Sequence, residues 1–300
     1  MAFGLGEAYA LTCALCWSTA VILFKQAGNS LTADGLNLTK NVFGVLLLIP
    51  TALIVEKLEI PALSSQQWLI LIASGYFGIA VADTWYFKAL RVLGAGRTAI
   101  VGSLYSPFVV MLSVAFLGET LKPWQWLGFG LVLIGVFIVT HQRNLGALER
   151  KTLFRGATFG AASIFLTAAG VVVMKPILAE EGFFWIAGLR MLAGVVGMLI
   201  YLSFVRRLSG IISDIRTKQH KWITIAVASL FGTYLAILFW LAGFKYADAS
   251  VASVLNETSS VMIVLLAWVC LKEPLTTKKI LGAMFTFFGV LVFIGVLEGT

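Results

Sequence analysis

Charged residues are scarce in this chain, and their scarcity excludes most classes of protein at once. Only 12% of the 300 residues are Asp, Glu, Lys or Arg, whereas 60% are hydrophobic and the mean hydropathy is +0.96. A soluble domain carries roughly a quarter charged residues. The chain is therefore not a soluble domain. Its net charge of +8 is attributed to loops and not to a nucleic-acid-binding surface.

Histidine and cysteine are also rare, with two and three residues respectively. His141 and His220 fall in basic loops, and the Cys13-x-x-Cys16 spacing lacks a second pair or a nearby histidine. We therefore interpret the cysteines as packed or lipid-facing thiols, with no metal site. Neither a phosphate-binding glycine loop nor a catalytic set of residues is present. We expect no catalytic residue, no enzyme activity and no cofactor, and the missing motifs argue against an ATP-driven pump.

Long apolar runs are what the chain has in abundance. About 20 apolar residues cross the hydrocarbon core of a bilayer as a helix, and every backbone polar group must be satisfied there. The sequence predicts an all-α, polytopic membrane protein with an uncleaved first span. The ten predicted transmembrane helices cover residues 6–24, 34–55, 67–90, 95–117, 124–140, 156–178, 183–205, 222–244, 249–271 and 279–297.

The sequence between Phe77 and Val136 is repeated without a gap 154 positions later. The first two spans repeat at a shift of 150. These repeats predict two five-helix units, residues 1–150 and 151–300. Pairs that match in both copies include Gly78/Gly232, Glu119/Glu273, Gly128/Gly282, Gly135/Gly289, Lys25/Lys175 and Lys40/Arg190.

Basic residues are unevenly divided between the two sides of the predicted membrane. The connections after the odd-numbered spans hold most of the Lys and Arg, whereas the opposite connections hold only Lys57, Lys122, Lys175 and Lys245. The positive-inside rule then places both termini outside the cytoplasm. Because each unit has five spans, the two units are inverted. An inverted repeat is the usual basis of alternating access in secondary transporters.

Several short motifs carry a family resemblance over essentially the whole chain. They are Trp17-Ser18, Phe24-Lys25, Tyr105-Ser106-Pro107-Phe108, Leu117-Gly118-Glu119-Thr120-Leu121 and Leu271-Lys272-Glu273-Pro274-Leu275. Together they resemble the drug/metabolite transporter superfamily, EamA type. The resemblance implies ten helices around a central cavity, with the fifth and tenth peripheral, and the export or exchange of small metabolites. In the ninth span Val261 takes the place of the expected proline, which leaves the symmetry of its kink with that at Pro107 open.

Polar residues that break the repeat are the first candidates for the cavity. Asp83 has Ile237 as its mate, and Glu257 has Ser103. A carboxylate in a membrane is costly and suggests function, although Asp83 could instead pair with Lys88 or Lys40. Asn256, Glu257 and Ser260 cluster in the ninth span. We predict that they line the cavity, with a helix-packing hydrogen-bond cluster as the alternative.

Three further kinds of residue complete the prediction. Lys40 and Arg190 could bind an anion, although snorkelling or paired structural charges are the favoured reading. Glu119 and Glu273 are assigned to the scaffold, capping the next helix. The aromatic residues predicted to line an apolar pocket are Trp17, Tyr76, Trp85, Tyr105 and Tyr234.

The sequence thus favours a secondary transporter, exporting or facilitating the passage of small organic metabolites such as amino acids. The expected location is the plasma membrane, the inner membrane in a bacterium. The alternative is an exchanger of anionic phosphorylated or nucleotide-linked solutes that uses Lys40 and Arg190. The expected partners are a small-molecule substrate and lipid, and not nucleic acid. One chain contains both units, so a monomer suffices. Coupling to protons, substrate identity and the direction of transport stay open.

Overall fold

The computed structural model describes residues 4–27, 31–56, 61–93, 98, 101–140, 150–217, 220–272 and 275–294, and these residues form helices and connections without a strand. The helices of the first half are α1 (Leu5–Ala27), α2 (Ala33–Val55), α3 (Ser65–Gly75), η1 (Tyr76–Val81), α4 (Ala82–Leu93), α6 (Tyr105–Leu117) and α7 (Pro123–Thr140). Those of the second half are α8 (Arg150–Glu180), α9 (Phe183–Phe204), α10 (Leu208–Thr217), α11 (Trp222–Ser229), η2 (Leu230–Leu235), α12 (Ala236–Tyr246), α13 (Ala249–Asn256), α14 (Thr258–Leu271) and α15 (Thr277–Phe293).

Seven helices within the described part of the chain are long and apolar enough to cross a membrane. The protein is therefore a multi-pass membrane protein, as predicted. The predicted number of ten spans is not confirmed. The apolar helices Tyr105–Leu117 and Ile280–Phe293 are shorter than a full span, because the fourth predicted span is interrupted at residues 103–104 and the last described helix ends at Phe293.

The third helix of each half contains a π-helical turn at the same repeat position. The turns are η1 and η2, which are 154 residues apart. In the first half the Asn37 side chain donates hydrogen bonds to the backbone oxygens of Ile79 (3.1 Å) and Ala80 (3.3 Å). A π-turn inserts one residue into a helix, and it therefore changes the face on which the following side chains lie.

The fourth helix of each half is followed by one residue in the left-handed conformation. Gly118 (φ 67°) follows α6 and Lys272 (φ 55°) follows α14, again 154 residues apart. Their backbone N–H groups bond to the oxygens of Ser113 and Ala267, which are themselves repeat mates. The duplicated sequence thus produces duplicated local geometry, even where lysine replaces the glycine that tolerates this conformation most easily.

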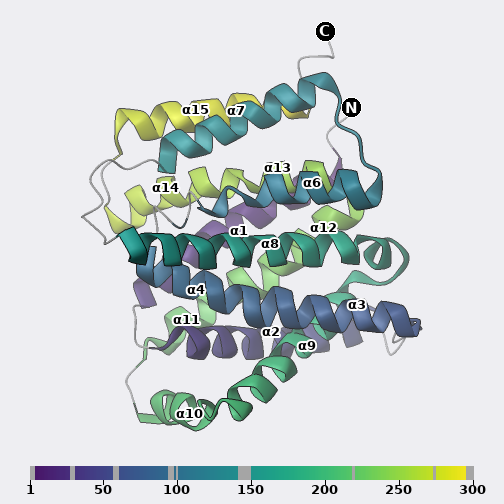
Figure 1. Cartoon of the computed structure of the whole chain (residues 1–300), viewed down its shortest axis with the longest axis vertical. Helices are drawn as coiled ribbons and strands as arrows, with labels where there is room; N and C mark the ends of the chain where they lie inside the picture. The colour runs from purple at the N-terminus through teal and green to yellow at the C-terminus, as the bar shows by residue number, and fades with distance from the viewer. Residues whose placement is uncertain are drawn as a thin grey trace.

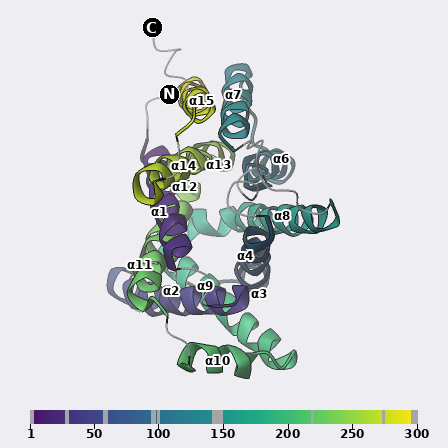
Figure 2. The same ribbon diagram turned by 90° about the vertical axis from the view of Figure 1, so that its left-hand side faces the viewer.

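The two halves are interleaved. The first helix of each half packs against the third and fourth helices of the other: α1 against α12 and α14, and α8 against α4 and α6. The two second helices, α2 and α9, pack together, and so do the fifth helices, α7 and α15, which lie at one edge of the molecule next to α13 and α14 (Figure 1). In Figure 2, α1 and α4 lie on opposite sides of the centre of the molecule.

Small residues allow the fifth helices to approach closely. A Cβ at Gly128 would lie 2.7 Å from the Gly289 backbone oxygen, and one at Gly135 would lie 2.6 Å from that of Gly282. Because 128 pairs with 282 and 135 with 289, exchanging the two halves maps one contact onto the other. The helices run antiparallel at this contact, so the local symmetry is that of a two-fold axis across them.

Glu119 joins the two halves at one end of the bundle. Its carboxylate accepts hydrogen bonds from the backbone N–H groups of Ala249 (2.7 Å) and Ser250 (3.0 Å) and from Lys175 Nζ (3.1 Å). The N-cap residue of α13, Asp248, makes no capping hydrogen bond of its own. The scaffold prediction therefore needs one correction, because Glu119 caps α13 of the other half and not the next helix. Glu273 lies outside the described residues.

The protonation of Glu119, which lies beyond the end of α6, makes stability depend on pH. Burial raises the pKa of this carboxyl, but the hydrogen bonds from Ser250 and Ala249 and the charge of Lys175 hold the pKa below its ordinary value of 4.5. A carboxyl with a lowered folded pKa stabilises the fold above the ordinary value and loses this contribution as the pH falls through the folded pKa. We expect Glu119→Gln to lower the unfolding free energy by about 1–2 kcal/mol at pH 7.

Thermal unfolding of the wild type and Glu119→Gln from pH 7 to pH 3 would test this expectation, with the more peripheral Glu180→Gln as the control. The difference between the wild type and Glu119→Gln should shrink below pH 4.5. A difference that stays constant over the whole range would contradict the assignment.

Candidate functional site

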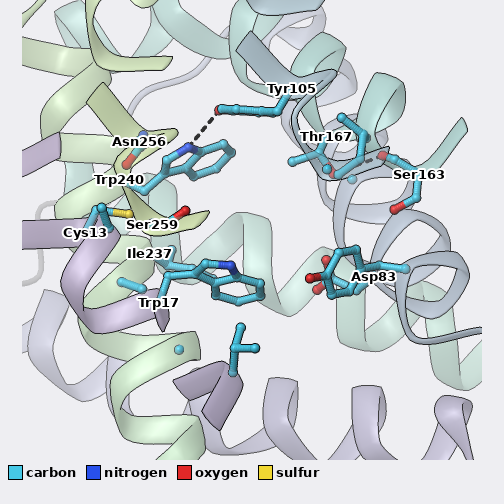
Figure 3. A pocket seen from close by; sticks show the side chains of 18 of the residues that line it. Cys13, Trp17, Asp83, Tyr105, Ser163, Thr167, Ile237, Trp240, Asn256 and Ser259 are labelled. Atoms are coloured by element: carbon cyan, nitrogen blue, oxygen red, sulfur yellow. Dashed lines mark hydrogen bonds between the residues drawn. The ribbon is translucent and has the colours of Figure 1, made fainter. Parts of the chain in front are cut away.

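A cavity of about 240 Å³ lies between the helices of both halves. Its walls come from α1, α2, α4, α6, α8, α9, α12, α13 and α14, with η1 and η2. Figure 3 shows part of its lining. The polar and aromatic side chains among the lining residues are Cys13, Trp17, Lys40, Asp83, Tyr86, Phe87, Tyr105, Ser163, Thr167, Arg190, Trp240, Asn256, Glu257, Ser259 and Ser260.

The structure brings most of the predicted site residues to this cavity. Trp17, Asp83, Tyr105, Asn256, Glu257, Ser260, Lys40 and Arg190 all line it. Tyr76, Trp85 and Tyr234 are not among the lining residues. The Tyr76 ring packs against Phe77, the Trp85 ring packs against Phe159, and the Tyr234 hydroxyl shares a hydrogen bond of 2.8 Å with the Thr51 hydroxyl.

Of the adjacent aromatic residues Trp85 and Tyr86 in α4, Tyr86 lines the cavity and Trp85 does not. Asp83, Tyr86, Phe87 and Leu90 all line the cavity, and their spacing of three, four and seven residues places them on one helical face. Their repeat mates in α12 show the same pattern, because Trp240 lines the cavity and Phe239 does not. The spacing from Asp83 is the sequence signal that could have identified Tyr86.

Lys40 and Asp83 form an ion pair in the cavity wall. The Lys40 Nζ is 2.7 Å from Asp83 Oδ2 and also donates to Asn41 Oδ1 at 2.8 Å. The Lys40 side chain is only 5% exposed, whereas that of Asp83 is 29% exposed. This is one of the structural alternatives that the sequence left open for both residues, so most of the Lys40 charge is already balanced.

Arg190, the repeat mate of Lys40, has no comparable partner. The residue is 2% exposed, and among the described residues no carboxylate forms a salt bridge with its guanidinium. Its Nε has no hydrogen-bond partner in the described part of the chain. The guanidinium lies over the Trp240 ring, 5.2 Å from its centroid. Ile237 occupies the position that Asp83 has in the first half. Arg190 is therefore a buried cation at the cavity wall, where the Asp83 charge acts on it but already forms an ion pair with Lys40.

Trp240 is held in place from its other side. Its indole N–H donates to the Tyr105 hydroxyl at 2.8 Å (Figure 3). A cation over an indole face is attracted by the ring, by about 2 kcal/mol when the pair is desolvated. Arg190, Trp240 and Tyr105 therefore form a preorganised chain from α9 through α12 to α6.

Glu257 lies at a break in the fourth helix of the second half. α13 ends at Asn256 and α14 begins at Thr258, so this helix is interrupted without the proline that the first half has at Pro107. Glu257 is 4% exposed, and its Oε1 accepts a hydrogen bond from the Ser106 backbone N–H at 3.1 Å. No Lys or Arg in the described residues forms a salt bridge with it.

The side-chain amide of Asn256, the residue before Glu257, is unpaired within the described part of the chain. Neither Nδ2 nor Oδ1 of Asn256 has a hydrogen-bond partner among the described residues. Buried polar groups are normally paired, and unpaired ones cost about 1–3 kcal/mol each. The cavity wall thus presents a cation, a carboxylate and a free amide between aromatic side chains. Within the described part of the chain, no group of His, Cys, Asp and Glu is placed to hold a metal ion.

Comparison with known proteins identifies the family of this chain. The model of the EamA-like transporter family matches residues 4–141 and again residues 154–295. The chain belongs to the EamA-like transporter family. The protein is therefore a transporter of the EamA type and not an enzyme, and the two matched segments correspond closely to the halves that the sequence repeat delimits.

Individual known proteins also resemble this chain over most of its length. An uncharacterized transporter of Archaeoglobus fulgidus is 23% identical over 94% of this chain and 95% of its own length. A UDP-N-acetylglucosamine transporter of Mus musculus is 24% identical over 72% of this chain and 67% of its own. A solved crystal structure with 19% identity matches with a TM-score of 0.79 and covers 97% of this chain and 96% of that chain. This last likeness concerns the fold alone.

Proposed function

We propose that this EamA-like protein is a secondary transporter of small zwitterionic metabolites, of which apolar amino acids are the best match. The observation that carries the proposal is Arg190, a buried cation without a carboxylate partner at the wall of a cavity of about 240 Å³. A ligand carboxylate would supply the missing charge. Pockets for drug-sized ligands are about 300–1,000 Å³, so this cavity suits a smaller solute.

The remaining polar groups match the other end of such a ligand. Glu257 and the unpaired amide of Asn256 would receive the ammonium group, because both offer acceptor oxygens in a largely apolar wall. The aromatic side chains of Trp17, Tyr86 and Trp240 would contact an apolar side chain. Lys40 and Asp83 neutralise each other and would add little net charge.

We further propose that the two halves form an inverted repeat that works by alternating access. The matching π-turns, the matching left-handed helix ends and the exchanged contacts of α7 and α15 support the repeat. The distribution of Lys and Arg supports an orientation with both termini outside the cytoplasm, in the plasma membrane. Two related halves provide two equivalent packings around one central site.

Counterflow into proteoliposomes tests the substrate class. Vesicles preloaded with an unlabelled L-amino acid should accumulate the same labelled amino acid, faster for leucine and phenylalanine than for aspartate or lysine. The preference follows from the aromatic wall and from one balanced pair of ligand charges. Empty vesicles and vesicles without protein are the controls. Absence of counterflow for every amino acid in the panel would refute the proposal.

A second candidate is an exchanger of nucleotide-linked anions. It is favoured by the similarity to UDP-N-acetylglucosamine transporters and by the presence of both Lys40 and Arg190 at the cavity. The size and charge of the ligand argue against this candidate. A nucleotide sugar is much larger than an amino acid and carries two phosphate charges, whereas the cavity has a volume of about 240 Å³. Competition distinguishes the candidates: UDP-N-acetylglucosamine or UMP at millimolar concentration should leave leucine counterflow unchanged if the first proposal is correct.

A further inference from the structure

The residues that line the cavity reach farther along the helices toward one end of the molecule than toward the other. We call this end the Asp34 end, because α1 ends and α2 begins there with Asp34 in its first turn; it faces the viewer in Figure 2. The opposite end, where Glu119 meets Lys175, is called the Glu119 end. Near the Asp34 end the cavity is lined by Val21 of α1 and by Phe87 and Leu90 of α4.

The repeat mates of these three residues do not line the cavity. They are Val171 of α8 and Leu241 and Phe244 of α12, each 0% exposed and in the main hydrophobic core. α8 and α12 pack directly against each other. By contrast, α1 and α4 face each other across the cavity and meet through ring contacts, Trp17 with Tyr86 and Phe24 with Phe87, with ring centroids 6.2 Å apart in each case.

Many residues deeper in the cavity behave differently, because both members of the repeat pair line it. These pairs include Cys13/Ser163, Trp17/Thr167, Lys40/Arg190, Asp83/Ile237, Tyr86/Trp240 and Tyr105/Ser259, whereas Ile79, Ala236, Glu257, Ser260 and Ile263 line the cavity without their mates. Both halves therefore contribute to the site. Val21, Phe87 and Leu90 differ from these pairs, because all three of their mates are fully buried in the core.

From this asymmetry we infer that Val171, Leu241 and Phe244 form the seal that closes the Glu119 end in this conformation. Their mates Val21, Phe87 and Leu90 form the corresponding seal of the Asp34 end in the opposite-facing conformation. The inference rests on the proposed alternating access. It assigns the residues that must separate, and those that must come together, in each transport cycle.

The side chains of the two triplets support equal roles. One triplet is Val, Leu and Phe, and the other is Val, Phe and Leu, with the phenylalanine and the leucine exchanged between the positions one helical turn apart. The two seals therefore consist of the same three types of side chain and have the same total side-chain volume. Cores tolerate hydrophobic exchanges that conserve total volume, so neither conformation gains a large packing advantage from its seal.

The matched variants Val21→Cys and Val171→Cys test the inference without any substrate. Each is made in a background with Cys13→Ser, Cys16→Ala and Cys270→Ala, whose folding is first checked by size-exclusion chromatography. In lipid nanodiscs, a small charged methanethiosulfonate reagent should modify Val21→Cys at least about tenfold faster than Val171→Cys. Minor conformations are commonly populated at about 0.1–10%, and Val171→Cys reacts only from that fraction.

Weakening one seal should exchange the accessibility of the two positions. Adding Phe244→Ala should raise the modification rate of Val171→Cys and lower that of Val21→Cys, each by about tenfold. Phe244→Leu, which copies the side chain of the mate Leu90, should have a smaller effect of the same sign and covers the case that Phe244→Ala does not fold.

Two results would overturn the inference: equal modification of both cysteines, or a rise at Val171→Cys without a fall at Val21→Cys, which would indicate a local void. Exchange of accessibility together with absent amino-acid counterflow would retain the two seals and refute the substrate alone.

Discussion

Arg190→Met is expected to lower the initial rate of amino-acid counterflow by about 100-fold or more while the protein stays folded. A hydrogen bond to a charged group contributes about 1.5–3 kcal/mol, and a guanidinium can form two with one carboxylate. Losing both corresponds to at least two orders of magnitude in affinity. The fold should survive because the described residues offer Arg190 no carboxylate whose charge would be left unpaired.

The replacement is chosen to keep the packing of the cavity wall. Methionine has a long apolar side chain that can lie against the Trp240 ring, where its sulfur makes a favourable contact. Arg190→Lys preserves the charge but loses the bidentate geometry and should give an intermediate rate. Lys245→Met removes a cation that bonds to the Glu181 backbone oxygen outside the cavity, and it should leave counterflow unchanged. Normal counterflow by Arg190→Met would contradict its proposed role.

Asp83→Asn is expected to destabilise the protein by about 3 kcal/mol, the lower part of the range for breaking a buried ion pair. The reason is that Lys40 would keep its charge with only Asn41 Oδ1 as an acceptor. Asp83 is partly exposed to the cavity, which allows some solvation of the remaining charge. Thermal unfolding in nanodiscs would measure the loss.

The double variant Lys40→Met/Asp83→Leu provides the matched comparison. Replacing both members of a buried ion pair by apolar residues of similar size is often neutral or stabilising, and the second half already carries Ile237 at the position of Asp83. We expect the double variant to recover most of the stability lost by Asp83→Asn. A double variant that is less stable than Asp83→Asn would show that the pair is held by more than mutual neutralisation.

The same double variant separates the two candidate substrates. An amino-acid transporter with Arg190 as its carboxylate site should retain measurable counterflow without Lys40. An exchanger of nucleotide-linked anions that uses Lys40 and Arg190 together should lose transport. The outcome therefore bears on the substrate as well as on stability.

The helical membrane character, the family and the internal repeat could be predicted from the sequence, because long apolar runs and a fixed spacing of 154 residues are one-dimensional patterns. Gly118 and Lys272 illustrate how far such a pattern reaches, since the repeat anticipates even a shared left-handed helix end. It also directed attention to Asp83 and Glu257, where the two copies differ. Both residues line the cavity.

The face of α4 that lines the cavity was decided by the tertiary structure, and the spacing from Asp83 identifies Tyr86 only once Asp83 is placed on that face. In a regular helix either Trp85 or Tyr86 could face the cavity. The π-turn of η1 (Tyr76–Val81) inserts a residue before α4 and rotates the face that follows. A π-turn depends on tertiary partners such as the Asn37 amide on α2, and no local pattern of α4 records that partner.

Charge pairing was decided by tertiary structure for the same reason. The sequence alone identified Lys40 and Arg190 as repeat mates, and so predicted that two cations lie at equivalent positions in the two halves. Only the packing of α2 against α4 brings the Asp83 carboxylate to Lys40. At the equivalent position of the second half Ile237 has no carboxylate to pair with Arg190. Burial and pairing depend on distances between helices far apart in the chain, and those distances determine which cation remains available to a ligand.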